Sequence, residues 1–311
     1  FLLQGKLKGG IKQANADLKL ASSFGNATFL GKLDQRKKNA EIYDLQANLQ
    51  DFNIGKLIQN DSLSQVTATV AVAGNSFDPK VMSTTISGNI ATAKFNGYLY
   101  ENLNLQANVN QGNYVADVKF KDANADLLFE ASGNFLNEHP TLELDGTIEK
   151  LDLYKMKLTA NPSALKGTIS ADFSDLHPDH LNGKLRLYNF AYADGKQVIP
   201  FDSLKIDAIS TSNINKLYVQ SQILDAKIEG KYTLTQLPEL LMQSISKYYE
   251  IVPNQDNASP NETYFDLDAR IKNDRILYLF LPDLKNFETA SIKANYKSET
   301  DYLNLQATFP N

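Results

Sequence analysis

The chain has 311 residues, with 31 basic and 36 acidic side chains and a net charge of −5. Both signs are scattered and no basic stripe is present, which argues against a nucleic-acid partner. The sequence contains no cysteine, which excludes a disulfide framework and a thiolate metal site. No stretch reaches the roughly 20 consecutive apolar residues that a membrane-spanning helix needs.

Apolar and polar residues alternate with a period of two along most of the chain, which predicts β-strands. Turn sequences such as Asn96-Gly97 and Asp194-Gly195 separate the runs. We therefore expect an all-β fold of about fifteen to twenty short strands, mostly antiparallel with one wet face. The clearest strand predictions, in chain order, are 66–72, 102–109, 141–145, 203–208, 264–271 and 302–309.

One short pattern recurs at roughly hundred-residue spacing. Gly31, Gly133 and Gly230 each follow a short apolar run and are separated by 102 and 97 residues. Repetition of one β unit predicts an elongated, stacked object without a unique compact pocket. We interpret residues 1–311 as one continuous repeat β domain and expect it to be a segment of a longer protein. Its approximate units are 1–60 (partial), 61–160, 161–252 and 253–311 (partial).

One segment departs from the strand pattern. Residues 237–251 have apolar positions at helical spacing, with Pro238 near the start, which predicts a short amphipathic helix. We expect it to cap the end of a sheet. The alternative is a helix that faces a membrane or a partner, but its polar side lacks the Lys/Arg content typical of binding to anionic lipid. Residues 254–261 predict a loop. The apolar positions of the helix are Leu237, Leu241, Ile245 and Tyr248.

Candidate chemical sites are few. His177 and His180 are separated by a Pro-Asp pair, which is more typical of a turn than of a metal site. The sequence 122–126 matches the start of a calcium loop, but Leu127 replaces the required glycine and Gly133 the required glutamate. No nucleophile elbow or phosphate-binding loop is present. We therefore predict no catalytic residue, no metal, no cofactor and no enzymatic activity.

The apolar side of the predicted strands is the remaining candidate site. Stacked strands would place these side chains on one long apolar surface, which forms a core if it is closed and a groove if it is open. Periodicity does not choose between the two. If the surface is a groove, its candidate lining residues are Val66, Val70, Val72, Leu103, Leu105, Val109, Leu142, Leu144, Leu185, Leu187, Leu204, Ile206, Phe265, Leu267, Leu303 and Leu305.

Several segments are similar to a known repeat. The stretches 86–90, 93–100 and 102–107 read ISGNI, AKFNGYLY and NLNLQA, while 122–130 and 278–284 read DANADLLFE and YLFLPDL. This text resembles the repeat of the Bacteroidota TamB proteins, part of the AsmA-like superfamily (translocation and assembly module). The resemblance covers most of the chain and supplies no catalytic residues.

The resemblance implies a taco-shaped β-groove in the periplasm of a Gram-negative bacterium. It also implies an N-terminal inner-membrane anchor outside this segment and a role in outer-membrane biogenesis. The cargo would be phospholipid moving between the two membranes, and an Omp85-type outer-membrane barrel would be a possible partner. A cysteine-free, Asn-rich β chain is consistent with the bacterial envelope.

Physical chemistry makes lipid conduction a reasonable function for such a surface. Exposing a sixteen-carbon tail to water costs on the order of 10 kcal/mol at about 0.8 kcal/mol per CH₂, and an apolar trough removes most of that cost. The main alternative is a scaffold for protein assembly or secretion, in which an open sheet edge pairs with strands of a client or partner barrel. A cell-surface β-solenoid or adhesin is a third possibility.

Overall fold

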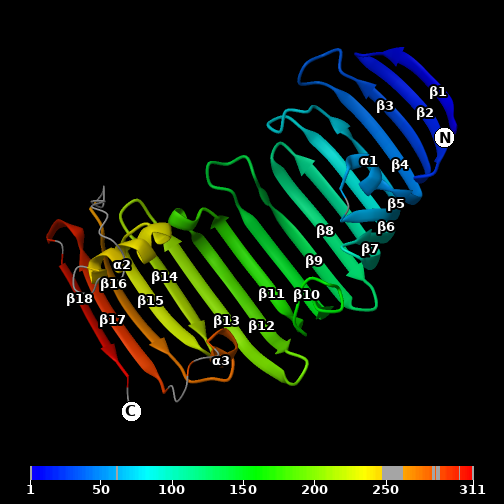
Figure 1. Ribbon diagram of the computed structural model, residues 1–311. Coiled ribbons are helices and arrows are strands. Elements are labelled where there is room, and N and C mark those ends of the chain that lie inside the picture. The colour runs from blue at the N-terminus through cyan, green and yellow to red at the C-terminus, as the bar shows by residue number, and fades with distance from the viewer. Residues whose placement is uncertain are drawn as a thin grey trace. The chain divides into compact units, whose positions relative to one another are not determined.

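The computed structural model describes residues 2–60, 62–246, 262–281, 284, 288–300 and 302–309. Over these residues the fold is all-β, as predicted: eighteen strands are present, with three short α-helices and three 3-10 turns (Figure 1). The strands are antiparallel and pair with their neighbours in the chain. Two compact units are distinguished: Phe1–Thr168 with Tyr192–Val198, and Ile169–Ala191 with Ile199–Asn311.

Unit 1 contains ten complete strands that pair in chain order, from β1 with β2 to β9 with β10. A five-residue helix, α1 (Ile54–Ile58), follows β4. The strands are β1 (Leu2–Gly10), β2 (Gln13–Ser22), β3 (Gly25–Asp34), β4 (Ile42–Asn53), β5 (Leu63–Asn75), β6 (Ser83–Phe95), β7 (Tyr98–Asn110), β8 (Asn113–Lys121), β9 (Ala125–Asn134) and β10 (Leu142–Asp152).

Two-residue hairpin turns fix the register in the middle of unit 1. Asn96 and Gly97 connect β6 to β7 with φ of 48° and 75°, and Gln111 and Gly112 connect β7 to β8 with φ of 49° and 82°. Positive φ at both central residues matches the twist of antiparallel strands, and Asn and Gly adopt it with little strain. The turn predicted at Asn96-Gly97 is therefore confirmed, and Gln111-Gly112 forms a second turn of the same kind.

Unit 2 contains the strands that follow, also paired in chain order from β13 with β14 to β17 with β18. The strands β11 (Ala164–Asp175), β12 (Asn182–Ala193) and β13 (Val198–Ser210) have residues in both units. The remaining elements are β14 (Asn215–Ser221), β15 (Leu224–Lys231), β16 (Tyr264–Ile271), β17 (Ala290–Lys297), β18 (Tyr302–Thr308), α2 (Leu237–Ser246), α3 (Leu277–Phe280), and the 3-10 turns η1 (Pro178–His180), η2 (Leu234–Gln236) and η3 (Ser298–Thr300).

The predicted amphipathic helix is present as α2, and its first turn is buried. Leu237 and Leu240 are 9% and 8% exposed, whereas Met242 is 48% exposed. Leu240 is not among the predicted apolar positions, which follow Leu237 at spacings of four, four and three. The side chains of Leu241 and Ile245 lie outside the described residues, as do Tyr248 and the predicted loop at 254–261.

The recurring glycines lie inside strands. Gly31 lies in the middle of β3, and Gly133 and Gly230 lie one residue before the ends of β9 and β15, so the strands continue through them. At Gly230 the backbone has φ of 153°, and an added Cβ would lie 2.1 Å from the carbonyl oxygen of Tyr264. Glycine therefore permits a close approach between neighbouring strands at this position.

Candidate functional site

The strand registers of unit 1 place apolar side chains on one face of the sheet. Leu105 on β7 lies opposite Gly88 on β6 and Val118 on β8, and Val118 lies opposite Phe129 on β9. Because side chains alternate across a strand, every second neighbour joins the same face. We call this surface the unit 1 apolar face, and its larger members include Leu18, Phe29, Leu45, Val70, Val72, Ile86, Ile90, Leu103, Leu105, Val109, Val118, Phe129, Leu142, Leu144 and Ile148.

The opposite face of the same strands is polar. Asn89 donates to Asn104 at 2.6 Å, and Thr69 donates to Asn48 at 2.7 Å, in each case from one strand to the next. These cross-strand pairs stabilise the strand order without a second layer above them. One face of unit 1 is therefore wet and amide-rich, and the other is aliphatic and aromatic.

Within unit 1, no second layer of the described strands or helices covers the apolar face. Each described strand contacts its neighbours in the sheet, and α1 contacts β5. Leu103, Leu105 and Val109 are consequently only partly buried, while Leu45 is 46% and Leu7 is 70% exposed. These side chains are shielded by their neighbours in the sheet and remain accessible from above.

One end of the unit 1 apolar face is filled by the segment that follows β10. Met156 is 2% exposed and packs with Phe120 and Ala125, against Tyr98, Tyr100, Leu103, Leu127 and Leu151. The ring of Tyr100 lies 4.8 Å from that of Tyr98 and 5.9 Å from that of Phe120. Lys157 holds this segment in place by donating to the carbonyl oxygen of Gly97 at 2.9 Å. Met156 therefore plugs this end with a small aromatic core.

Unit 2 has an apolar face of its own. Ile206 on β13 lies opposite Val219 on β14, which lies opposite Ala226 on β15. On β12, Arg186 forms an ion pair with Asp207, which places it on the polar side. Leu185 and Leu187 alternate with Arg186, so they lie on the apolar side. The other members include Leu204, Leu217, Ile228, Leu267, Ile292, Leu303 and Leu305.

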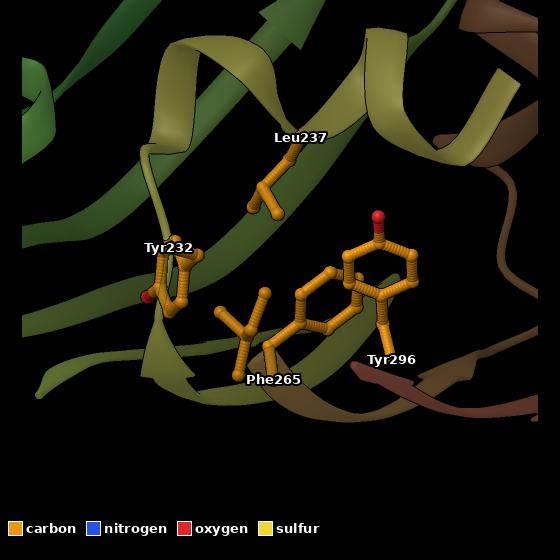
Figure 2. Close-up of a cluster of buried hydrophobic side chains, with 5 residues drawn as sticks. Tyr232, Leu237, Phe265 and Tyr296 are labelled. Atoms are coloured by element: carbon orange, nitrogen blue, oxygen red, sulfur yellow. The ribbon is translucent and has the colours of Figure 1, made fainter. Parts of the chain in front are cut away.

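A buried cluster closes one end of the unit 2 apolar face (Figure 2). Phe265 is 1% exposed and stacks on Tyr296 at 5.4 Å, and Leu237 of α2 packs on the same cluster together with Ile228 and Tyr232. Burial opposes the phenolate form and raises the pKa of Tyr232 to about 12, with smaller contributions from Glu229 and Tyr218. Helix α2 therefore acts as a cap on this part of the face, as the sequence predicted.

The other end of the unit 2 face is covered by the segment that contains α3. Ile276 and Leu277 are 5% and 7% exposed. Gln222 donates to Asp274 at 2.7 Å, and Lys272 donates to the carbonyl oxygen of Ser221 at 2.8 Å. These polar bonds fix the segment beside the turn between β14 and β15.

The polar face of unit 2 is densely charged. Glu229 accepts a hydrogen bond from Tyr218, and Lys227 lies 3.1 Å from its carboxylate. The Tyr218 hydrogen bond and then the Lys227 hydrogen bond lower the pKa of Glu229 to about 2. A hollow of about 400 Å³ lies over this face, lined in part by Asp266 and Lys293. Its charges are balanced by neighbouring strands and are exposed to water.

The structure groups the predicted lining residues by unit. Val66, Val70, Val72, Leu103, Leu105, Val109, Leu142 and Leu144 lie on the unit 1 apolar face, and the other eight lie on that of unit 2. Val66 and Phe265 are 6% and 1% exposed, so they belong to the local cores and offer no surface to a ligand. Sequence reasoning missed Phe29, Leu45 and Ile86, whose strands show the same alternation, and Met156, which no periodic signal marks.

The two motifs with metal-like spacing form turns. Asp122 accepts from the backbone N–H groups of Asn124 at 2.6 Å and Ala125 at 2.8 Å, so the segment turns into β9. His177 precedes the 3-10 turn η1, and Asp179 accepts from the backbone N–H of Thr235 at 2.9 Å. Over the described part of the chain, no three acidic or histidine side chains converge into a metal-sized cluster.

Comparisons with protein families, curated proteins and solved structures gave no match for this chain. The resemblance to the TamB family therefore remains a prediction. Among the helices that the structure describes, none has the length and apolar character needed to cross a membrane.

Proposed function

We propose that the chain binds acyl chains of lipids on its apolar faces and conducts phospholipid between the two membranes of a Gram-negative envelope. The observation that supports this proposal is the unit 1 apolar face, which is assembled in register and carries no second layer among the described elements of that unit.

The dimensions of the face suit this role. Nine spacings of about 4.8 Å between ten strands give about 43 Å, and four face positions at about 6.8 Å give at least 20 Å along each strand. The product is a footprint on the order of 1,000 Å², of which the buried side chains and the end covered by Met156 offer no surface. Soluble monomers rarely expose contiguous apolar patches above a few hundred Å². A patch of this size favours a hydrophobic ligand.

The composition of the face suits a mobile ligand as well. Its members are aliphatic and aromatic, and polar groups capable of fixing one headgroup are confined to the opposite face and the strand ends. An acyl chain would gain about 0.8 kcal/mol for each CH₂ removed from water, and would gain it at any position along the face. Binding without a unique register is what conduction needs.

Native mass spectrometry of the purified chain, combined with lipid extraction, tests the proposal. We expect stoichiometric phospholipid on the wild-type protein, either co-purified or acquired from liposomes. A folded protein that carries no lipid after incubation with liposomes would contradict the proposal and favour assembly by strand pairing.

The second candidate is a scaffold that adds strands of a client protein, and the exposed strand β1 is the segment that would pair with them. Within the described part of the chain β1 pairs with β2 alone, and its nine residues are all exposed. Wherever the outer edge of β1 has no further strand beside it, that edge offers backbone donors and acceptors for β-augmentation. Cross-linking of a client peptide to β1 at Lys6 or Lys8, with the apolar faces lipid-free, would support this candidate.

A further inference from the structure

Three neighbouring loops at one end of the unit 1 strands form a continuous rim. The backbone N–H of Gln35 donates to the carbonyl oxygen of Lys12 at 2.9 Å, and that of Ser76 donates to the carbonyl oxygen of Glu41 at 2.9 Å. The side chain of Asn39 donates to Asp78 at 3.3 Å. The three loops, 11–12, 34–41 and 76–82, therefore lie side by side along one edge of unit 1 (Figure 1), and we call them the loop rim.

The loop rim is cationic in an otherwise acidic chain. It carries five basic and three acidic side chains, whereas the whole chain has a net charge of −5. Arg36 is engaged by Asp34 through hydrogen bonds of 2.9 and 2.5 Å, which also lower the pKa of Asp34. The remaining basic side chains are exposed, and no carboxylate of the described residues lies within ion-pair distance of them. They are Lys12, Lys37, Lys38 and Lys80.

The acidic groups of the rim are held by its own loops. Glu41 accepts from the backbone N–H groups of Asn39 at 3.1 Å and Phe77 at 3.3 Å, and Asp78 accepts from the backbone N–H of Lys80 at 3.0 Å. The carboxylates therefore shape the loops, while the lysine ammonium groups remain directed to solvent.

Large apolar side chains stand beside these lysines. Ile11 is 92% exposed at the tip of the first hairpin, and Phe77 and Val81 are 52% and 43% exposed in the third loop. Ile11 and Val81 lie beyond the strand ends, whereas the ring of Phe77 stacks on that of Tyr43 at 5.2 Å and continues the unit 1 apolar face. Exposed apolar tips flanked by unpaired lysines match the interface of an anionic bilayer, where apolar groups enter the acyl boundary and lysines meet phosphate.

We propose that the loop rim binds the surface of an anionic phospholipid bilayer. The apolar tips enter the headgroup layer and the four lysines neutralise lipid phosphates. This interaction is separate from acyl-chain binding on the apolar faces and holds whether or not those faces conduct lipid. It would bring unit 1 against a membrane through its strand ends.

Co-sedimentation of the full chain with vesicles tests this proposal. We expect binding to vesicles of equal parts phosphatidylcholine and phosphatidylglycerol that weakens with added salt, and much weaker binding to phosphatidylcholine alone. The rim variant replaces Lys12, Lys37, Lys38 and Lys80 with Gln. Because each lysine contributes about fivefold to the partition coefficient, the coefficient of the rim variant should be lower than that of the wild type by more than about a hundredfold.

A matched control separates rim binding from general charge attraction. Replacing Lys6, Lys8, Lys19 and Lys32 with Gln removes the same charge from exposed positions on the polar face of β1, β2 and β3. This control should keep most of the binding. An Ile11→Ser/Val81→Ser variant should lose binding without a change in net charge.

Two results would overturn the proposal: equal binding of the rim variant and the wild type, or equal loss in the rim variant and the control. Fatty-acid loading of the rim variant should stay unchanged, so failure of the rim and failure of the proposed acyl-chain function give different patterns. If the loop rim bound a protein and did not bind the vesicles, that result would also contradict the proposal that it binds a bilayer.

Discussion

A charged substitution in the middle of the unit 1 apolar face gives the sharpest test of acyl-chain binding. Leu105 lies between Gly88 and Val118, is partly buried, and does not belong to the Met156 cluster. Replacing it with Asp should therefore leave the fold intact. Loss of a half-buried leucine contact costs about 1 kcal/mol of stability, and the carboxylate stays hydrated because the face is open.

The effect on ligand binding should be larger than the effect on stability. A carboxylate at this position would keep its hydration shell and separate the ligand from the face over about one strand spacing on each side. Lost contact with about four CH₂ groups, at about 0.8 kcal/mol each, weakens binding by about 3 kcal/mol, or about a hundredfold. A fluorescent fatty acid titrated into wild-type and variant protein measures this difference.

Gln106→Asp is the matched control. Gln106 is the next residue of β7 and is exposed on the opposite face. Its replacement by Asp introduces the same charge. We expect the control to bind fatty acid like the wild type. Equal affinity of Leu105→Asp and Gln106→Asp in folded proteins would refute the assignment of the face as the binding surface.

Three further predictions concern the framework. Phe265→Ala should lower the free energy of unfolding by about 3–5 kcal/mol in denaturant titrations, because the ring is 1% exposed; a loss below about 1 kcal/mol would contradict the packing of α2. Raising the pH from 10 to 12 should lower the melting temperature of the wild type more than that of Tyr232→Phe. The pKa of Tyr232 rises from 10.0 to about 12 on folding, so the stability that this shift contributes is complete below pH 10 and is lost as the pH rises towards 12. Equal losses of melting temperature in the two proteins would contradict this. Gly97→Ala should cost about 1 kcal/mol or more, because φ is 75° and the new Cβ would meet the Lys157 amine at 3.0 Å. Gly88→Ala should be tolerated, since its nearest neighbour, the Cβ of Leu105, would be 3.9 Å away; equal melting temperatures for the two alanine variants would argue against the turn geometry.

Alternation in the sequence was sufficient to predict the fold class and many strands. The predicted strand 264–271 is β16, and 102–109 lies within β7. The period-two pattern has a direct physical cause, because successive side chains of a pleated strand point to opposite faces, and segments with this pattern therefore form strands in the structure. It also assigned correctly which side of a strand is apolar, as with Leu103 and Leu105, which both lie opposite apolar partners on β8.

The closures of the faces were harder to predict. Met156 lies in an irregular segment, and its burial depends on Phe120 and Ala125, which are distant in sequence. The α2 cap could be predicted because a helical period is local, but its contact with Phe265 and Tyr296 is not local. Sequence periodicity describes a face, whereas the contacts that close its ends depend on three-dimensional packing.

The β-bulges show why alternation alone does not predict which residues lie on the apolar faces, and why the strand registers are needed as well. Strict alternation after Leu49 would place Asp51 on the unit 1 apolar face, but an extra residue in β4, with Asp51 at φ of 48°, brings Phe52 there instead, opposite Val66. A bulge in β10 has the same effect. The register shift after Ile148 places Lys150 on the polar face and brings Leu151 to the Met156 cluster. A one-residue insertion reverses the side of every later side chain. Each bulge therefore keeps a charge out of the apolar face at the end where the aromatic plug forms, and removing one of them should open that end to water.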